Sequence, residues 1–404
     1  MRNQAWLNHM VSLFGERTEI LRNSLDSAAA DPSGKPVDME ERFGSLALDI
    51  IGKAVFNYEF GSVDEESPVV SAAIATLRES EHRAMTPAPY WKLPGAGAKG
   101  FPVIVPRQAA FQKNMALLND ELNGAIAKAL EDRDPADEED LQNRDYSKMS
   151  NPSLLRFMVD MRGEETSSTQ LRDDLMTMLI AGHETTASAL TWALFEMRQN
   201  QELMDKVRAE IDSVIGDRAP TVDDLEKLEL TRLCVAESLR MYPEPPLLIR
   251  RSLNEVQLPA DSTGVAVKLL RASDIMINVY SLHRSPLYWE QPDVFDPERF
   301  LRPYKNDADP NWAGFDPEAW RGKVWYPNEV AADFAYLPFG AGQRKCVGDQ
   351  FALLEATVAL AMVLQRYDFD FAAPTATPAD VGTNTGATIH TRNGLWMAVK
   401  RRQA

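Results

Sequence analysis

The chain has 404 residues, of which 44% are hydrophobic and 25% are charged, a balance typical of a globular protein with a large core. Its net charge of -17 argues against a nucleic acid as partner, because the phosphates would be repelled. Two cysteines are too few for a disulfide framework, which fits a reducing compartment. No run of the sequence is long and apolar enough to span a bilayer.

Helices dominate the first part of the chain. Hydrophobic residues at helical spacing predict helices over residues 6–25, 38–55, 67–81 and 107–131. Asp38 is placed to cap the second of these helices. The acidic stretch that follows the fourth, residues 131–140, is expected to be a solvated loop.

A glycine-rich segment lies between the third and fourth helices. Gly95-Ala-Gly97-Ala-Lys-Gly100 matches the dinucleotide-binding pattern G-x-G-x-x-G. That pattern needs a strand before it and a helix after it. The residues before Gly95 are no clear strand, and Phe101-Pro-Val-Ile-Val-Pro106 after Gly100 cannot open a helix. A nucleotide-binding loop is therefore rejected.

The longest uninterrupted helical pattern runs from Arg172 to Gln199 and contains Ala181-Gly-His-Glu-Thr-Thr186. His183-Glu184 resembles the start of a zincin motif, but Ala187 stands where the second histidine should be. A glycine, an acid and two hydroxyls destabilise an apolar helix and require an explanation. Ordinary polarity of an exposed helix face remains an alternative to a functional role.

A later helix is expected from Thr221 to Tyr242, with Glu237 and Arg240 on one face and able to pair. A surface salt bridge is the common explanation of such a pair. Residues 274–280 predict a strand, and 385–390 with 395–399 predict a terminal hairpin. A calcium-loop pattern from Asp307 to Glu318 fails because Trp312 occupies the glycine position.

The most informative stretch runs from Tyr336 to Gly348 and precedes an apolar helical pattern over residues 349–365. It places Cys346 in a glycine-rich loop just before a helix, where backbone N–H groups and the helix dipole favour a metal-ligating thiolate. A lone cysteine is more often a small buried hydrophobe. The surrounding pattern favours the ligand interpretation, because glycines allow close approach of a flat group and Arg344 suits a carboxylate.

This loop resembles the cysteine loop of the haem-thiolate monooxygenases, the cytochrome P-450 family, at Phe339, Gly342, Arg344, Cys346 and Gly348. The resemblance implies haem b as cofactor, with Cys346 as the ligand of its iron. Such a thiolate pushes electron density towards bound oxygen and favours O–O cleavage. The remaining loop residues would form the haem-binding loop, with Arg344 as one propionate partner. Arg250 is expected to be a second.

The resemblance extends to other segments. Glu184 and Thr185 match the acid and alcohol of the family's oxygen-binding groove and are expected to deliver protons. Glu237 and Arg240 match its E-x-x-R motif, completed by Arg299 of Pro297-Glu-Arg-Phe300 as a structural ionic network. The resemblance places five residues along the substrate cavity: Ala181, Leu247, Leu248, Ile249 and Thr388.

Longer stretches are most similar to the plastid carotenoid-hydroxylase branch of plants and algae, among them Tyr242-Pro-Glu-Pro-Pro246 and Thr385-Gly-Ala-Thr-Ile-His390. The implied activity is hydroxylation of a C–H bond of an apolar substrate, a carotenoid ring, with O₂ and two electrons. A ferredoxin or flavoprotein reductase would donate the electrons near Arg344, Lys345 and Arg366. Plastid location is implied; the endoplasmic reticulum membrane and the cytoplasm are alternatives, and peripheral membrane association stays open.

The expected fold is a single mainly α domain over residues 1–404, with a small β region. Family members normally carry a strand-rich segment and a haem-clamping helix before the point where this chain starts. The sequence therefore predicts an N-terminally truncated form that retains haem weakly. A non-catalytic remnant, a haem-thiolate enzyme that rearranges hydroperoxides and an oxygenase of another lipid or terpenoid remain as alternatives.

Overall fold

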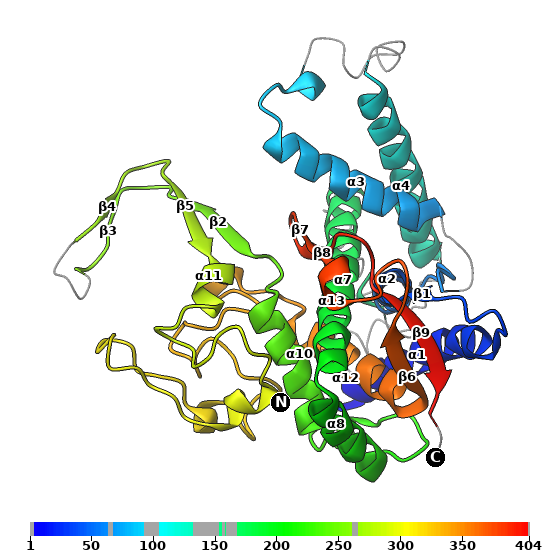
Figure 1. Ribbon diagram of the computed structural model, residues 1–404. Helices are drawn as coiled ribbons and strands as arrows, with labels where there is room; N and C mark the ends of the chain where they lie inside the picture. The colour runs from blue at the N-terminus through cyan, green and yellow to red at the C-terminus, as the bar shows by residue number, and fades with distance from the viewer. Residues whose placement is uncertain are drawn as a thin grey trace. The chain divides into compact units, whose positions relative to one another are not determined.

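The computed structural model describes residues 4–63, 68–92, 105–131, 153–155, 158, 168–260 and 266–402. The chain divides into two compact units, which are described separately. The first contains Met1–Gly34 and Glu41–Ala187, and the second contains Lys35–Glu40 and Ser188–Ala404. Helices predominate in Figure 1 and the sheets are small, so the expected mainly α fold is confirmed.

Long helices build the first unit. Its elements are α1 (Gln4–Ala30), most of α2 (Met39–Ile51), the π-helix η1 (Gly52–Phe56), α3 (Pro68–Met85), η2 (Tyr90–Lys92), α4 (Pro106–Glu131) and the first half of α7 (Ser168–Gln199). Helices α3 and α4 lie side by side (Figure 1). Phe14, Leu21 and Phe43 are fully buried in the core, so the helical periodicity of the sequence correctly identified the inward faces.

The second unit combines helices with short antiparallel strands. Its helices are the rest of α7, α8 (Gln201–Val214), α9 (Val222–Leu225), α10 (Glu229–Met241), α11 (Val279–His283), η5 (Pro297–Leu301), η6 (Pro317–Ala319), η7 (Gly342–Arg344), α12 (Asp349–Arg366) and α13 (Pro378–Val381). Residues 353–364 of α12 are all buried, which explains the continuous apolar pattern of that helix.

Among the residues that the structure describes, four small sheets complete this unit. Strand β9 (Trp396–Arg401) lies between β1 (Val37–Asp38) and β6 (Tyr367–Phe371). The other sheets are pairs: β2 (Leu247–Arg251) with β5 (Asp274–Asn278), β3 (Val256–Gln257) with β4 (Lys268–Leu269), and β7 (Thr383–Thr385) with β8 (Ile389–Thr391). Figure 1 shows the β2–β5 pair as an arm that carries β3 and β4 at its far end.

Two sequence expectations about these elements are wrong. Residues 221–242 form two helices instead of one. Thr221 and Asp224 form a capping box at the start of α9. Helix α10 begins separately, because Glu210 of α8 accepts hydrogen bonds from the N–H groups of Leu230 and Thr231 in its first turn. The terminal strand β9 pairs with β6 rather than with residues 385–390, which instead form the β7–β8 hairpin. Helix α8 was not expected. The segments 95–100 and 132–140 lie outside the described residues.

Candidate functional site

The loop before α12 holds Cys346 in a fixed backbone conformation. Gly340 and Gly342 have φ angles of +69° and +68°, in the left-handed region that favours glycine. The backbone N–H of Cys346 donates to the carbonyl of Phe339 at 2.9 Å, which closes the loop. The backbone N–H of Gly348 donates to the Cys346 thiol. The loop therefore presents one sulfur atom immediately ahead of a buried helix.

Side chains on both sides of the cysteine fix the loop to the rest of the unit. The Tyr326 ring packs edge-on against Phe339 with centroids 5.1 Å apart, and its hydroxyl donates to Asp349 Oδ2 at 2.7 Å. Lys345 Nζ pairs with Glu329 at 2.9 Å and with Asp349 at 3.4 Å. Lys345 is thus an internal ion-pair partner, which leaves its charge largely satisfied within the chain.

Cys346 is exposed, yet its immediate surroundings do not stabilise a free thiolate. Desolvation by nearby protein atoms raises the pKa of the thiol, and the Asp349 carboxylate adds to this rise. The Gly348 N–H and the Lys345 charge lower the pKa but do not outweigh it. The expected contribution of a backbone N–H is thus present, but the pKa of the uncoordinated thiol stays above its ordinary value. A bound cation would supply the missing stabilisation, since metal binding deprotonates a coordinating thiol.

Three charged side chains meet behind this loop. Arg240 donates to both carboxylate oxygens of Glu237 at 2.8 Å, and Arg299 Nε donates to Glu237 Oε1 at 3.0 Å. Glu237 and Arg240 are fully buried. The two guanidinium groups also donate to the backbone carbonyls of His283, Glu290, Gln291 and Val294. The structure thus brings the three predicted network residues together in a buried and hydrogen-bonded cluster.

Two residues that sequence reasoning missed connect this cluster to the cysteine loop. His283 is fully buried, and its Nε2 accepts a hydrogen bond from the Leu337 N–H at 2.7 Å. The Tyr336 hydroxyl donates to the carbonyl of Ala236 in α10 at 2.6 Å. Burial, with a smaller effect of the Arg240 charge, lowers the pKa of His283 to about 3, so the ring is neutral.

Strand β2 approaches the cysteine loop with one of its two faces. Leu248 and Arg250 are half-buried, whereas Leu247 and Ile249 point to the opposite face and are exposed. A Cβ atom built on Gly340 would lie 3.9 Å from Leu248 Cδ1, which places this face next to the loop. The three residues of β2 predicted to line the substrate cavity therefore lie on two faces of the strand, Leu248 on one and Leu247 and Ile249 on the other.

Two arginines near the loop form no ion pair among the described residues. Arg344 is exposed, and Arg250 has only a hydrogen bond from Nη1 to the Ile249 carbonyl at 2.9 Å. The neighbouring Arg251 is different, because it forms a two-bond pair with Asp274 at 2.6 and 2.7 Å. Arg250 and Arg344 are therefore available for an anionic ligand.

The groove residues of α7 belong to the first unit, so their placement is described separately from Cys346. The Thr185 hydroxyl donates to the Ala181 carbonyl at 2.8 Å, one turn earlier, and Glu184 is half-buried. Gly182 permits close packing, since a Cβ there would lie 2.6 Å from Ile51 Cδ1 of α2. The glycine that destabilises the isolated helix is thus explained by a helix–helix contact.

Thr388 lies at the turn of the β7–β8 hairpin. It is 3% exposed, and its hydroxyl is hydrogen-bonded to Nε2 of His390. Glu40 contacts the other nitrogen of His390 and accepts from Thr391. The turn is therefore held by polar contacts inside the second unit.

The sequence model of the family described as Cytochrome P450 matches residues 1–396. The chain belongs to this family. It is 51% identical over 407 residues to Cytochrome P450 97B2, chloroplastic, of Glycine max, covering 99% of this chain and 69% of that protein.

Two relatives from Arabidopsis thaliana are also similar. Protein LUTEIN DEFICIENT 5, chloroplastic, is 43% identical over 401 residues, which cover 99% of this chain and 61% of that protein. Carotene epsilon-monooxygenase, chloroplastic, is 41% identical over 390 residues, which cover 96% of this chain and 65% of that protein. The chain thus spans roughly two thirds of the length of these P450 relatives.

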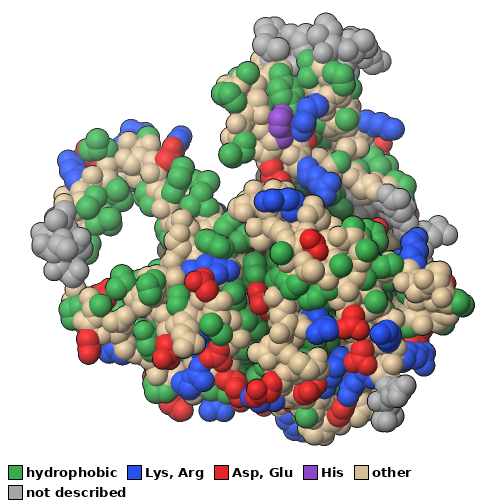
Figure 2. Space-filling view, in the orientation of Figure 1, with side chains coloured by type: hydrophobic (Ala, Val, Ile, Leu, Met, Phe, Trp, Pro, Cys, Tyr) green, Lys and Arg blue, Asp and Glu red, His purple; other side chains and the backbone are tan. Residues whose placement is uncertain are grey.

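Members of the P450 family bind haem through a cysteine thiolate, and the residues around Cys346 fit such a group. The thiol is accessible, Val347 beside it is 95% exposed, and Leu248 supplies an apolar neighbour. Arg250 and Arg344 offer two cations for two propionates. Figure 2 shows hydrophobic side chains along the β2–β5 arm, where Ile249 and Met276 are 58% and 65% exposed.

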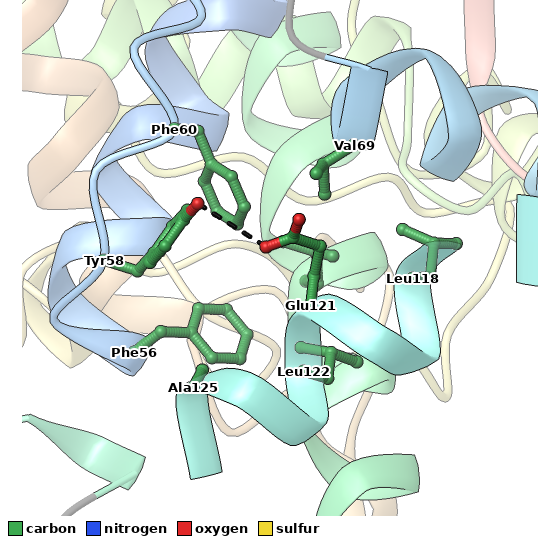
Figure 3. Close-up of a pocket in the computed structure, with 9 residues that line it drawn as sticks. Phe56, Tyr58, Phe60, Val69, Leu118, Glu121, Leu122 and Ala125 are labelled. Atoms are coloured by element: carbon green, nitrogen blue, oxygen red, sulfur yellow. Dashed lines mark hydrogen bonds between the residues drawn. The ribbon is translucent and has the colours of Figure 1, made fainter. Parts of the chain in front are cut away.

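Other candidate sites are weaker. Among the described residues, no three His, Cys, Asp or Glu side chains are grouped to hold a metal ion. No helix within the residues that the structure describes is long and apolar enough to cross a membrane. Figure 3 shows a pocket of the first unit between Phe56, Tyr58 and helix α4, where the Tyr58 hydroxyl lies 3.5 Å from Glu121.

Proposed function

We propose that this chain is the catalytic part of a haem-thiolate monooxygenase that hydroxylates a carotenoid ring. The observation that carries the proposal is the accessible Cys346 thiol in a braced loop, in a chain that is 41% identical to a carotene epsilon-monooxygenase. Haem b, when bound, supplies the oxygen chemistry, since a cysteine ligand favours O–O cleavage. The protein contributes ligation, orientation and proton delivery.

Residues of the second unit would hold the cofactor. Cys346 is the iron ligand in this proposal, and Phe339, Gly342 and Gly348 shape the loop around it. Arg344 and Arg250 would pair with the propionates. Among the described residues, neither arginine forms an ion pair with a carboxylate that would compete with a propionate. The buried Glu237, Arg240 and Arg299 cluster keeps the preceding segment in place, so the sulfur position does not depend on the cofactor alone.

Glu184 and Thr185 would manage protons. The Thr185 hydroxyl already directs its hydrogen to the Ala181 carbonyl, so its oxygen lone pairs can accept a hydrogen bond from a ligand or a water. Glu184 is half-buried at the adjacent position. We assign proton delivery to this pair together with water. As a relay, Thr185 would turn its hydroxyl hydrogen from the Ala181 carbonyl to the proton acceptor while its oxygen accepts a hydrogen from a water bound by Glu184.

The substrate is assigned as a long apolar polyene. Two relatives carry this assignment, one named for lutein and one for carotene, and both are chloroplastic, as is Cytochrome P450 97B2. Ala181, Leu247, Leu248, Ile249 and Thr388 remain the proposed lining, with Leu248 on the face that approaches the cysteine loop. A plastid location follows from the same relatives.

A redox partner must supply two electrons. A ferredoxin or a flavoprotein reductase would dock near the cysteine loop, where Arg344 is exposed. Lys345 contributes less than its sequence position indicated, because Glu329 and Asp349 neutralise its charge. Arg344 is therefore the basic residue of this group on which docking would most depend.

Product analysis tests the proposal. The haem-loaded protein is incubated with β-carotene, a ferredoxin and its reductase under O₂, with Cys346→Ser as the matched inactive control. A hydroxylated carotenoid made only by the wild-type protein is expected. Absence of product from a wild-type sample with a thiolate-type CO spectrum would reject the carotenoid substrate but retain the haem assignment.

A further inference from the structure

A buried carboxyl group lies in the short segment between α10 and β2. Glu244 is only 6% exposed, although its segment is rich in prolines and joins the helix of the ionic cluster to the strand beside the cysteine loop. Neither the ligation of haem nor proton delivery uses it. Its contacts reach two other segments of the second unit, α7 and β8.

The carboxyl group bridges these segments through hydrogen bonds. Glu244 Oε1 lies 2.6 Å from the Ser188 hydroxyl of α7, and Oε2 accepts from the N–H of Ile389 in β8 at 2.9 Å. The Ile389 carbonyl lies 2.7 Å from the same Ser188 oxygen and accepts from Trp192 Nε1 at 2.6 Å. Both backbone polar groups of Ile389 therefore have hydrogen-bond partners. Strand β8, which begins at this residue, lies close to α7 in Figure 1.

Ser188 stands between the two groups that the bridge joins. Its hydroxyl oxygen lies within hydrogen-bond distance of both the Glu244 carboxyl and the Ile389 carbonyl. A hydroxyl carries one hydrogen and two lone pairs, so it can contact both groups at once. Together with the bond from the Ile389 N–H to Glu244, these contacts form a ring of hydrogen bonds.

The location of this ring connects it with substrate binding. Ile389 directly follows Thr388, and Glu244 comes three residues before Leu247, so each end of the bridge adjoins a residue proposed to line the cavity. The same junction is rigid, because Tyr242 stacks on Trp192 with ring centroids 4.1 Å apart and planes 3° apart. A shift of Glu244 would therefore move the Thr388 turn relative to the start of β2.

We propose that Glu244 is a positioning residue that fixes the Thr388 turn against strand β2 and thereby sets which ring carbon is presented for oxidation. This rests on the proposed function for its catalytic consequence, while the bridge itself is independent of it. Glu244 acts through Ile389 and Thr388 and touches no reacting atom.

Hydrogen–deuterium exchange of the β7–β8 hairpin tests the bridge without substrate or turnover. Glu244→Ala should speed exchange in the peptide that contains Ile389 by about tenfold, because the amide loses its acceptor. The exchange rate in Glu244→Gln should stay within about twofold of wild type, since the side-chain amide can still contact the Ser188 hydroxyl and accept from the Ile389 N–H. Ser188→Ala should give an intermediate increase and covers the case in which Glu244→Ala does not fold.

Glu196→Gln is the matched control. Glu196 is a carboxyl group of α7 at the same junction, where it accepts from the Tyr242 hydroxyl at 2.6 Å rather than from the hairpin. This variant should leave hairpin exchange unchanged. Unchanged exchange in Glu244→Ala, or exchange in Glu244→Gln as fast as in Glu244→Ala, would overturn the proposal.

The catalytic consequence has a separate readout. In haem-loaded protein, Glu244→Ala should lose the wild-type preference for one hydroxylation position, and Glu244→Gln should keep it. An altered hairpin with an unchanged product pattern would overturn the positioning role. A wild-type protein that hydroxylates no carotenoid would instead overturn the proposed function, and the exchange data would still decide the bridge.

Discussion

The N–H of Leu337 donates a hydrogen bond to Nε2 of the fully buried His283 at 2.7 Å. The carbonyl of the same histidine accepts from Arg240 at 2.7 Å. His283 thus connects the Glu237 cluster to the segment that leads into the cysteine loop. Because the bond requires an unprotonated Nε2, the position of the loop depends on a neutral imidazole.

Stability should depend on pH through His283. Its pKa is about 3 in the folded protein against 6.5 for an ordinary histidine, so the unfolded chain takes up a proton that the folded chain does not. Stability should therefore fall as the pH decreases below 6.5, by up to about 1.4 kcal/mol per pH unit from this group. Denaturant unfolding between pH 7 and pH 5 measures the slope.

His283→Gln should flatten that slope, because glutamine can accept the Leu337 bond but does not titrate. Replacing the exposed His9 by Gln is the control and should leave the slope as in wild type. A slope that is the same in His283→Gln and in wild type would show that this histidine is not the titrating group.

Removing Arg299 should destabilise the protein strongly. Arg299→Ala removes one of the two guanidinium groups that pair with the buried Glu237, and it leaves the carbonyls of Glu290 and Val294 without this donor. The free energy of unfolding should therefore decrease by about 3–5 kcal/mol. Arg321→Ala breaks a more exposed pair with Glu229 and should change it by less than about 1 kcal/mol. Equal effects in the two variants would contradict the structural role of the cluster.

Gly182→Ala should destabilise the protein by about 1–3 kcal/mol, because the new methyl group would overlap Ile51 in α2. Ile51→Ala should create the space that the methyl group needs. The double variant should then be less destabilised than the sum of the two single variants, as measured by denaturant unfolding. Strict additivity would indicate that the two residues are not in contact.

Arg250→Ala should weaken haem retention, since a charge-assisted bond to a propionate would be lost. We expect haem to transfer to an excess of apomyoglobin about tenfold faster than from wild type. The adjacent Arg251→Ala is the control, because Arg251 is already paired with Asp274. Identical transfer rates for the two variants would remove Arg250 from the propionate site.

The sequence was informative wherever a motif is local. Cys346 and its glycines, the Glu237–Arg240 spacing and the apolar face of α12 lie within single segments, so their geometry follows from helix and turn rules. The contacts of His283, Tyr336 and Glu244 were missed because their partners are distant in the chain, and no local spacing marks them. The break between α9 and α10 has the same origin, since Glu210 of α8 caps the second helix.

The ligand assignment of Cys346 is tested most directly by the absorption spectrum of the reduced, CO-treated protein, compared per haem bound in wild type and Cys346→Ser. We predict the red-shifted Soret band of a thiolate-ligated haem in wild type and its loss in Cys346→Ser. A red-shifted band that persists in Cys346→Ser, or a wild-type band typical of a nitrogen ligand, would contradict the assignment.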